Sequence, residues 1–135
     1  MKALIVISPK FCETFYLKNK IYQLWIFADD EHRILELARR IKKFQVYPWH
    51  HGGADIIYPN NNKALGIKKA IENEADYRLI CIGDGANDIK MIEMADIGIA
   101  MSNTRFEELK EKAKHLAPHI KEDQLYDFFK SINLI

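Results

Sequence analysis

The sequence predicts an α/β protein whose main sheet is parallel and carries helices on both faces. Two short segments, residues 79–82 and 97–100, are wholly apolar, and the segment between them, 87–95, has the apolar spacing of a helix. Strands that are buried on both faces are continuously apolar, and the helices that connect parallel strands cover the faces of the sheet. In such sheets ligands bind beyond the carboxyl ends of the strands, so we expect the functional residues there.

Turn-forming residues at positions 59–62 divide the chain, and the part before them reads as a smaller unit with its own strands. Aromatic and β-branched residues predict a strand at 21–28, and Asp29 and Asp30 then suit the N-cap of an amphipathic helix. The glycines at positions 52 and 53 suit a tight hairpin. The expected elements are strands at 3–7, 21–28, 44–49 and 54–58 and a helix at 31–43.

The second part alternates helices and strands. Thr104 and Glu107 have the spacing of a capping box, which predicts a helix that carries Phe106 and Leu109. The other expected elements are helices at 63–73, 87–95 and 125–132, strands at 79–82 and 97–100, and an extended segment at 115–118. We therefore predict two regions, 1–59 and 60–135.

Composition narrows the function classes. The chain has 135 residues, with 48% hydrophobic and 29% charged residues and a formal net charge of +1, which is typical of a folded soluble domain. This balance favours neither nucleic acid nor an anionic membrane as a partner, and no apolar run approaches the ~20 residues that span a bilayer. Cys12 and Cys81 lack metal-ligand spacing, and we expect reduced thiols in a cytoplasmic protein.

The loop at residues 83–88, Gly-Asp-Gly-Ala-Asn-Asp, carries the strongest chemical signal. Its two glycines allow a sharp turn with exposed amide groups, as in phosphate-binding loops. However, Asp84 and Asp88 would repel a phosphate at close range. A hard cation between them removes the conflict, and Mg²⁺ prefers few carboxylates together with waters and substrate oxygens. An ordinary strand-to-helix turn is the alternative.

Two further features have both functional and structural explanations. Lys63 stands at the start of a predicted helix, where the helix dipole disfavours a cation, so it suits an anionic group opposite, although a solvated surface lysine explains it too. Trp49, His50 and His51 lie in the predicted hairpin. Neighbouring strand residues point to opposite faces, so a two-histidine metal site is disfavoured, and a solvated turn or a ligand-contacting loop remains.

Taken together, these motifs resemble the haloacid dehalogenase superfamily of phosphohydrolases, specifically Cof-type sugar-phosphate phosphatases with a large α/β cap. Residues 55–67, which include Lys63, look like the third motif of the family, and residues 83–103 look like the fourth. Residues 21–58 resemble the final part of the cap. The resemblance implies a partial cap at 1–59, followed at 60–135 by the C-terminal part of a Rossmann-type core.

The resemblance also implies roles for individual residues. Asp84 would be a direct Mg²⁺ ligand, and Asp88 a second ligand or a support for the first. Lys63 would contact the phosphoryl group, Asn87 would fix the loop or touch phosphate, and the turn at Trp49 and His50 would face the substrate. The implied partner is a small phosphorylated metabolite, with no nucleic acid and no membrane.

The sequence departs from the family at its first motif, because it contains no Asp-x-Asp. That motif supplies the carboxylate that attacks phosphorus and forms an aspartyl-phosphate. Ser8, after the predicted strand at 3–7, stands either for a remnant of the first motif or for the second motif, or this stretch is simply cap sequence, which we favour.

Two function classes follow. The chain is a phosphatase whose nucleophile comes from a longer form or a complementing chain, or it is a truncated or repurposed module that binds Mg²⁺ or phosphate without turnover. The phosphorylation domain of a P-type ion pump has a similar fourth motif, but the cap-like residues 21–58 argue against it. Because the missing segment would leave a sheet edge bare, we also expect a homo-oligomer or a complementing chain. The alternative is a monomer in which the strand at 3–7 folds back onto that edge.

Overall fold

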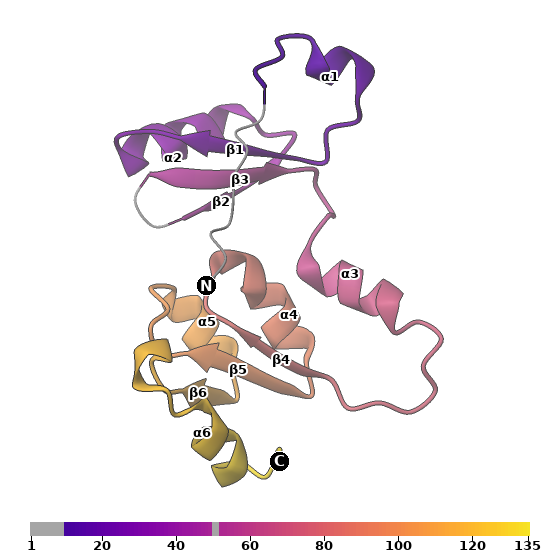
Figure 1. Ribbon diagram of the computed structural model, residues 1–135, viewed down its shortest axis with the longest axis vertical. Coiled ribbons are helices and arrows are strands. Elements are labelled where there is room, and N and C mark those ends of the chain that lie inside the picture. Colours follow the sequence, from indigo (N-terminus) through magenta and orange to yellow (C-terminus); the bar gives the residue numbers. More distant parts are fainter. Residues whose placement is uncertain (1–9, 50–51) are drawn as a thin grey trace.

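The computed structural model of the chain describes residues 10–49 and 52–135, and it contains two three-stranded sheets (Figure 1). The first sheet lies in the upper half of Figure 1 and the second in the lower half, and α3 (Lys63–Ala70) lies between them in the chain. The strand predicted at 3–7 and the residues His50 and His51 lie outside the described residues. The predicted boundary at residue 59 falls between the two sheets.

The first sheet is antiparallel, with the strand order β1-β3-β2. Its strands are β1 (Gln23–Phe27), β2 (Gln45–Pro48) and β3 (Gly53–Ile57). Helix α2 (Glu31–Arg40) packs on one face, where Ile34 is 1% exposed, and Asp30 caps it by accepting a hydrogen bond from the His32 amide. A short helix, α1 (Phe15–Lys18), precedes β1 and has no buried residue. Strand β3 is therefore the buried centre of this unit.

The second sheet is parallel, with the order β4-β5-β6, as the fold class requires. Its strands are β4 (Ile80–Gly83), β5 (Ile97–Met101) and β6 (His115–Ala117). The connecting helices are α4 (Ile89–Met94) and α5 (Glu107–Lys112), and α6 (Leu125–Ser131) follows a 3₁₀ turn, Ile120–Glu122. All five residues of β5 are buried, which explains why the segment is continuously apolar.

Helices cover both faces of this sheet, which confirms the predicted fold class. On one face Cys81 and Ala100 pack against Ile92, Leu109 and Ala64, which belong to α4, α5 and α3. On the other face Ile97, Ile99 and Met101 pack against α6 through Leu125, Phe128 and Phe129. The two faces use alternate residues of β5, as the two-residue repeat of a strand demands.

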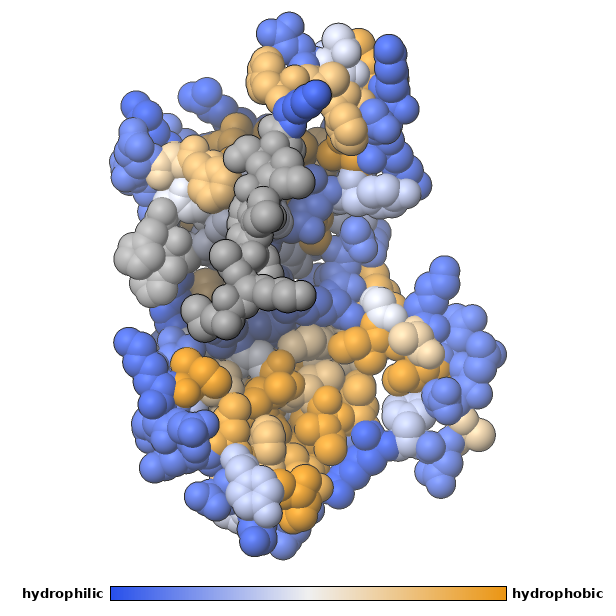
Figure 2. Space-filling model, in the orientation of Figure 1, coloured by the Kyte–Doolittle hydropathy of each residue, from blue (hydrophilic) through white to orange (hydrophobic). Residues whose placement is uncertain are grey.

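Strand β4 is only partly covered. Among the described residues it is an edge strand, because β5 pairs with one of its sides and no described strand pairs with the other. Ile80 and Ile82, which lie on the face that α6 covers over β5, are 44% and 39% exposed. Figure 2 shows hydrophobic side chains gathered over the lower half of the molecule, where this sheet lies. This uncovered strip beside β4 is unusual for a buried-type strand.

The predicted elements are present with shifted ends. The helix expected at 31–43 ends at Arg40, and the one expected at 63–73 ends at Ala70. The helix expected at 87–95 begins as a 3₁₀ turn, Ala86–Asp88, before α4. Neither α1 nor the turn at Ile120–Glu122 was predicted. No helix in the described part of the chain is long and apolar enough to cross a bilayer.

Candidate active site

The site forms where β4 ends, at the carboxyl edge of the parallel sheet. The chain leaves β4 at Gly83, passes through Asp84 and Gly85, and turns into the 3₁₀ turn that starts α4. A Cβ atom on Gly83 would lie 2.5 Å from the Cβ of Asp88, so only glycine permits this approach. The glycine thus serves close packing, whereas the sequence had suggested a role in sharp turning.

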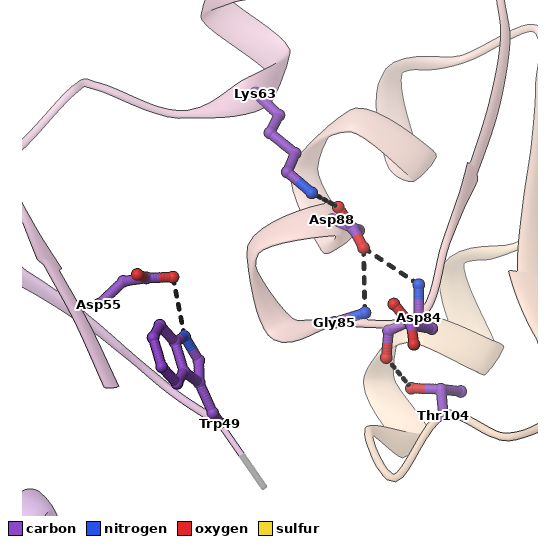
Figure 3. Close-up of polar contacts among 7 residues, drawn as sticks. All are labelled: Trp49, Asp55, Lys63, Asp84, Gly85, Asp88 and Thr104. Atoms are coloured by element: carbon purple, nitrogen blue, oxygen red, sulfur yellow. Dashed lines mark hydrogen bonds and ion pairs between the residues drawn. The ribbon is translucent and has the colours of Figure 1, made fainter. Parts of the chain in front are cut away.

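Asp88 holds the loop in shape from within. It is 3% exposed, and its Oδ2 accepts hydrogen bonds from the backbone amides of Asp84 and Gly85, each at 3.0 Å (Figure 3). Its Oδ1 forms an ion pair with the Lys63 ammonium. Both carboxylate oxygens are therefore engaged by the protein, and the residue acts as a brace between the loop and α3.

Asp84 has the opposite character. It is exposed, and among the described residues its carboxylate accepts a single hydrogen bond, a long one of 3.5 Å from Asn103. Its backbone is nevertheless fixed, because the amide donates to Asp88 and the carbonyl accepts a 2.6 Å hydrogen bond from the Thr104 hydroxyl. The loop thus fixes the backbone of Asp84 and leaves its carboxylate exposed beyond the carboxyl edge of the sheet.

Thr104 corrects a sequence prediction. The capping box with Glu107 is wrong, because α5 begins at Glu107 after Phe106, and the Thr104 hydroxyl accepts a 3.1 Å hydrogen bond from the Phe106 amide in place of the Glu107 amide. Instead Thr104 is 6% exposed and ties the loop after β5 to the loop after β4. In the sequence, Thr104 fits a helix cap as well as a contact with another loop, and only the tertiary structure shows which contacts it makes.

Lys63 lies beside the loop, with its side chain about half exposed to solvent. Asn62 caps α3 by accepting a hydrogen bond from the Leu65 amide, and this places Lys63 at the first position of the helix. Its side chain is 49% exposed and its ammonium pairs with Asp88. An ammonium group has three donors, so Lys63 keeps donors for a ligand. Both explanations from the sequence describe part of what is observed, because the side chain is half exposed and its ammonium also meets an anionic group.

The first sheet contributes the opposite wall of the site. Trp49 follows β2, and its indole Nε1 donates a 2.9 Å hydrogen bond to Asp55 on β3 (Figure 3). Gln23 on β1 donates to the other oxygen of Asp55. Trp49 lines a cavity of about 220 Å³ together with Asp84, Asn87 and Asn103. Trp49 therefore lies beside the loop of Asp84, whereas His50 lies outside the described residues.

Arg105 joins the two walls. It follows β5 and donates 2.6 Å and 3.1 Å hydrogen bonds to the Trp49 carbonyl and to Glu31 at the start of α2. Nothing in the sequence signalled this residue, because its partners lie 56 and 74 positions away. The Asp29–Glu31 cluster, which we interpreted as helix capping, therefore also supplies a contact between the two sheets.

The site has local chemical consequences for a neighbouring thiol. Burial raises the pKa of Cys81, and the negative charge of Asp88 raises it further. Cys81 is 5% exposed and lies in β4, inside the core cluster. It is therefore a packing residue and is poorly suited to act as a nucleophile.

The oxygen ligands at this site suit Mg²⁺, but they are too few to complete its coordination. Asp84 offers one free carboxylate, Asn87 and Asn103 line the same cavity, and the ion tolerates one or two carboxylates with waters and substrate oxygens. Within residues 10–49 and 52–135 no group of three or more His, Cys, Asp or Glu side chains could hold a metal. Ligands beyond the described protein atoms, including a phosphate, would have to complete it.

These features define a class: an α/β protein with a carboxylate-bearing loop after a buried strand, a lysine beside it and a second sheet above it. Residues 7–129 match the family of haloacid dehalogenase-like hydrolases, and the chain belongs to this family. The resemblance inferred from the third and fourth motifs is confirmed.

Several relatives of the chain carry the name of a phosphatase. It is 33% identical over 130 residues to a Bacillus subtilis protein named "Putative phosphatase YkrA". It superposes on the HAD subclass IIB sugar phosphatase BT4131 with a TM-score of 0.72 at 28% identity, over 87% of this chain. For the phosphatase BT1666 of Bacteroides thetaiotaomicron the TM-score is 0.74 at 25% identity, over 91% of this chain. These alignments cover most of the chain, which favours a capped phosphatase over an ion pump.

The chain is shorter than these relatives. Its match with YkrA covers 94% of the chain but 49% of that protein, and the two solved phosphatases are covered over 45% and 46% of their lengths.

Proposed function

We propose that this chain supplies the charge-stabilising half of a Mg²⁺-dependent phosphomonoester hydrolase that acts on a sugar phosphate. The observation that carries the proposal is the division of labour between two carboxylates four residues apart. Asp88 is buried and braced by three hydrogen bonds, while Asp84 is exposed with its loop fixed. A rigid loop that presents one free carboxylate suits a cation, which would offset the negative charge on phosphoryl oxygens when bound.

In this proposal each residue has a defined task. Lys63 holds Asp88 and turns its remaining donors toward the phosphoryl group, so it offsets charge that builds up there. Asn87, which lines the cavities on both sides of the loop, contacts phosphate oxygens or the leaving group. Trp49 faces the substrate from the first sheet, and we retain His50 as a predicted neighbour.

The chain contains no Asp-x-Asp, and the attack on phosphorus needs such a carboxylate. We propose that it comes from a complementing polypeptide segment that pairs with the bare edge of β4. The uncovered strip formed by Ile80 and Ile82 supports this, because a strand and its helix would bury it. A strand there would end beside Asp84, since parallel strands end at the same edge of a sheet.

The alternative is a module that binds Mg²⁺ or phosphate without turnover. The same braced loop supports it, since binding needs Asp84 and Lys63 but no nucleophile. The absence of a nucleophile from the sequence is what favours it.

Two measurements test these proposals. First, calorimetry of the chain with Mg²⁺ and inorganic phosphate should show mutually dependent binding that Asp84→Asn abolishes. Asp76→Asn is the matched control, because Asp76 is exposed and precedes β4, at the far end of the strand. Equal binding by all three proteins would refute a metal site at Asp84.

Second, hydrolysis of a sugar phosphate should be undetectable for the chain alone. It should appear when the missing half of YkrA is supplied as a separate polypeptide, and Asp84→Ala should abolish it. Phosphate binding without any turnover in the complemented mixture would favour the non-catalytic module. Turnover by the purified chain alone that is lost in Asp84→Ala would show that another residue replaces the nucleophile.

A further inference from the structure

The cleft between the two sheets has a second lobe that the proposed chemistry does not explain. It has a volume of about 310 Å³ and is lined by Asp55 and Gln23 from the first sheet and by Asn61, Lys63 and Asn87 from the opposite side. Asn87 and Tyr47 line both this lobe and the one above Asp84, so the two lobes are neighbours that share these residues as walls. A ligand held at Lys63 would extend its other end into this space.

Asp55 is the unexpected residue in this lobe. It is 8% exposed at the centre of β3, and its two oxygens accept hydrogen bonds from Gln23 and from the Trp49 indole. Both donors are neutral, and among the described residues no cationic side chain forms an ion pair with Asp55. Burying a carboxylate without a neighbouring cation costs free energy, so the burial of Asp55 requires an explanation.

Two side chains of opposite charge line the lobe. Lys63 and Asp55 both line this lobe, and Figure 3 shows them on separate elements, with the Lys63 ammonium turned toward Asp88 and the Asp55 carboxylate hydrogen-bonded to Trp49. Arg105 lies in the other lobe and pairs with Glu31, so it does not offset Asp55. A ligand that fits both ends has a negative group at Lys63 and hydrogen-bond donors at Asp55.

Asp55 also has unused acceptor capacity. A carboxylate has about four lone-pair sites, and two are occupied. Hydroxyl or amino groups can use the others, whereas a second phosphate or a carboxylate would face repulsion at short range. The side-chain amides of Gln23 and Asn61 accept and donate, which also suits hydroxyl groups.

From this arrangement, and resting on the proposed function, we infer that Asp55 is a specificity-determining residue. It selects phosphate monoesters whose leaving group is a neutral or amino polyol and rejects those whose leaving group carries a carboxylate or a second phosphate. A role as a simple tie between β1, β2 and β3 is the competing explanation, and the two differ in what a charge-neutral replacement does.

Asp55→Asn separates them, because asparagine can keep the strand contacts. Its Oδ1 can accept from the Trp49 indole, and its amide can donate to a flipped Gln23. Binding to the chain with Mg²⁺ is measured by calorimetry for three probes: glucose 6-phosphate, 3-phosphoglycerate and inorganic phosphate. The control is Asp76→Asn, and thermal melts confirm that both variants fold.

We expect the unmutated chain and Asp76→Asn to prefer glucose 6-phosphate to 3-phosphoglycerate. In Asp55→Asn the preference should fall about tenfold, the size expected for one hydrogen bond to a charged group. Inorganic phosphate, which does not reach Asp55, should bind equally to all three proteins.

The outcomes separate the two hypotheses. Unchanged selectivity in a folded Asp55→Asn that still binds phosphate overturns the inference alone and leaves Asp55 as a strand tie. A preference for 3-phosphoglycerate in the unmutated chain overturns it as well. If the unmutated chain binds none of the three probes, the proposed function fails and the inference fails with it.

Discussion

Removal of Asp88 should lower the stability of the protein, whereas removal of Asp84 should abolish Mg²⁺ binding and leave stability nearly unchanged. Asp88 accepts hydrogen bonds from two backbone amides and from Lys63, and it is 3% exposed. In Asp88→Ala the amides of Asp84 and Gly85 lose their acceptor and the lysine loses its partner. Each hydrogen bond to a charged group contributes about 1.5–3 kcal/mol when buried.

Exposure to solvent reduces the contribution of these hydrogen bonds to the free energy of unfolding. The side chain of Lys63 is 49% exposed, so its share falls toward the ~1 kcal/mol of a surface ion pair. The two amides are partly buried, and water can replace part of what they lose. We therefore expect Asp88→Ala to lower the free energy of unfolding by about 3–4 kcal/mol.

Asp84→Ala should cost less than about 0.5 kcal/mol, because the side chain is exposed and the variant keeps the backbone bonds to Asp88 and Thr104. Mg²⁺ binding should nevertheless disappear. Urea denaturation followed by circular dichroism measures the first effect, and calorimetry with Mg²⁺ the second. Equal losses of stability in the two variants, or Mg²⁺ binding that survives Asp84→Ala, would refute the division between a brace and a ligand.

Three further outcomes follow from the fold. Sedimentation at micromolar concentration should show a species heavier than 15.8 kDa, because no described strand pairs with the outer edge of β4; a single species of that mass, stable on concentration, would contradict this. At pH 8 iodoacetamide should modify exposed Cys12 before Cys81, since burial and Asp88 raise the pKa of Cys81 and keep its thiol protonated until higher pH; equal rates by mass spectrometry would argue against it. Arg105→Gln should speed hydrogen exchange in β2 and leave β5 unchanged, because Arg105 holds the carbonyl that follows β2; unchanged exchange in β2 would show that the contact is not stabilising.

Much of the fold could be predicted because its determinants are local. The residues of β5 are buried on both faces, and a run of five apolar residues records that directly. Asn62 and Asp30 cap their helices through contacts two or three residues away, so the cap and the helix are read from the same short segment. Helix ends were less accurate, since the last turns of α2 and α3 depend on what they pack against.

The candidate site, too, could be predicted only where its residues are close together in the sequence. Asp84 and Asp88 lie in one loop, so their spacing and the strand before them indicated a shared pocket. Whether Lys63 met them could not be judged from its neighbours, because the ion pair joins residues 25 positions apart. The resemblance to known phosphatases supplied that pairing, whereas composition and periodicity did not.

By itself, the sequence determined the alternation of elements, the parallel sheet and the identity of the carboxylate-bearing loop, since each depends on residues within one or two turns. Only the tertiary structure decided which carboxylate is free. Asp88 is buried and pairs with Lys63 of α3, whereas Asp84 is exposed and contacts Asn103 after β5, so both outcomes depend on elements outside the loop. It also decided the wall opposite, where Asp55, Trp49 and Arg105 meet through contacts between separate strands and loops. Such contacts join residues far apart in the chain, and no local pattern records them.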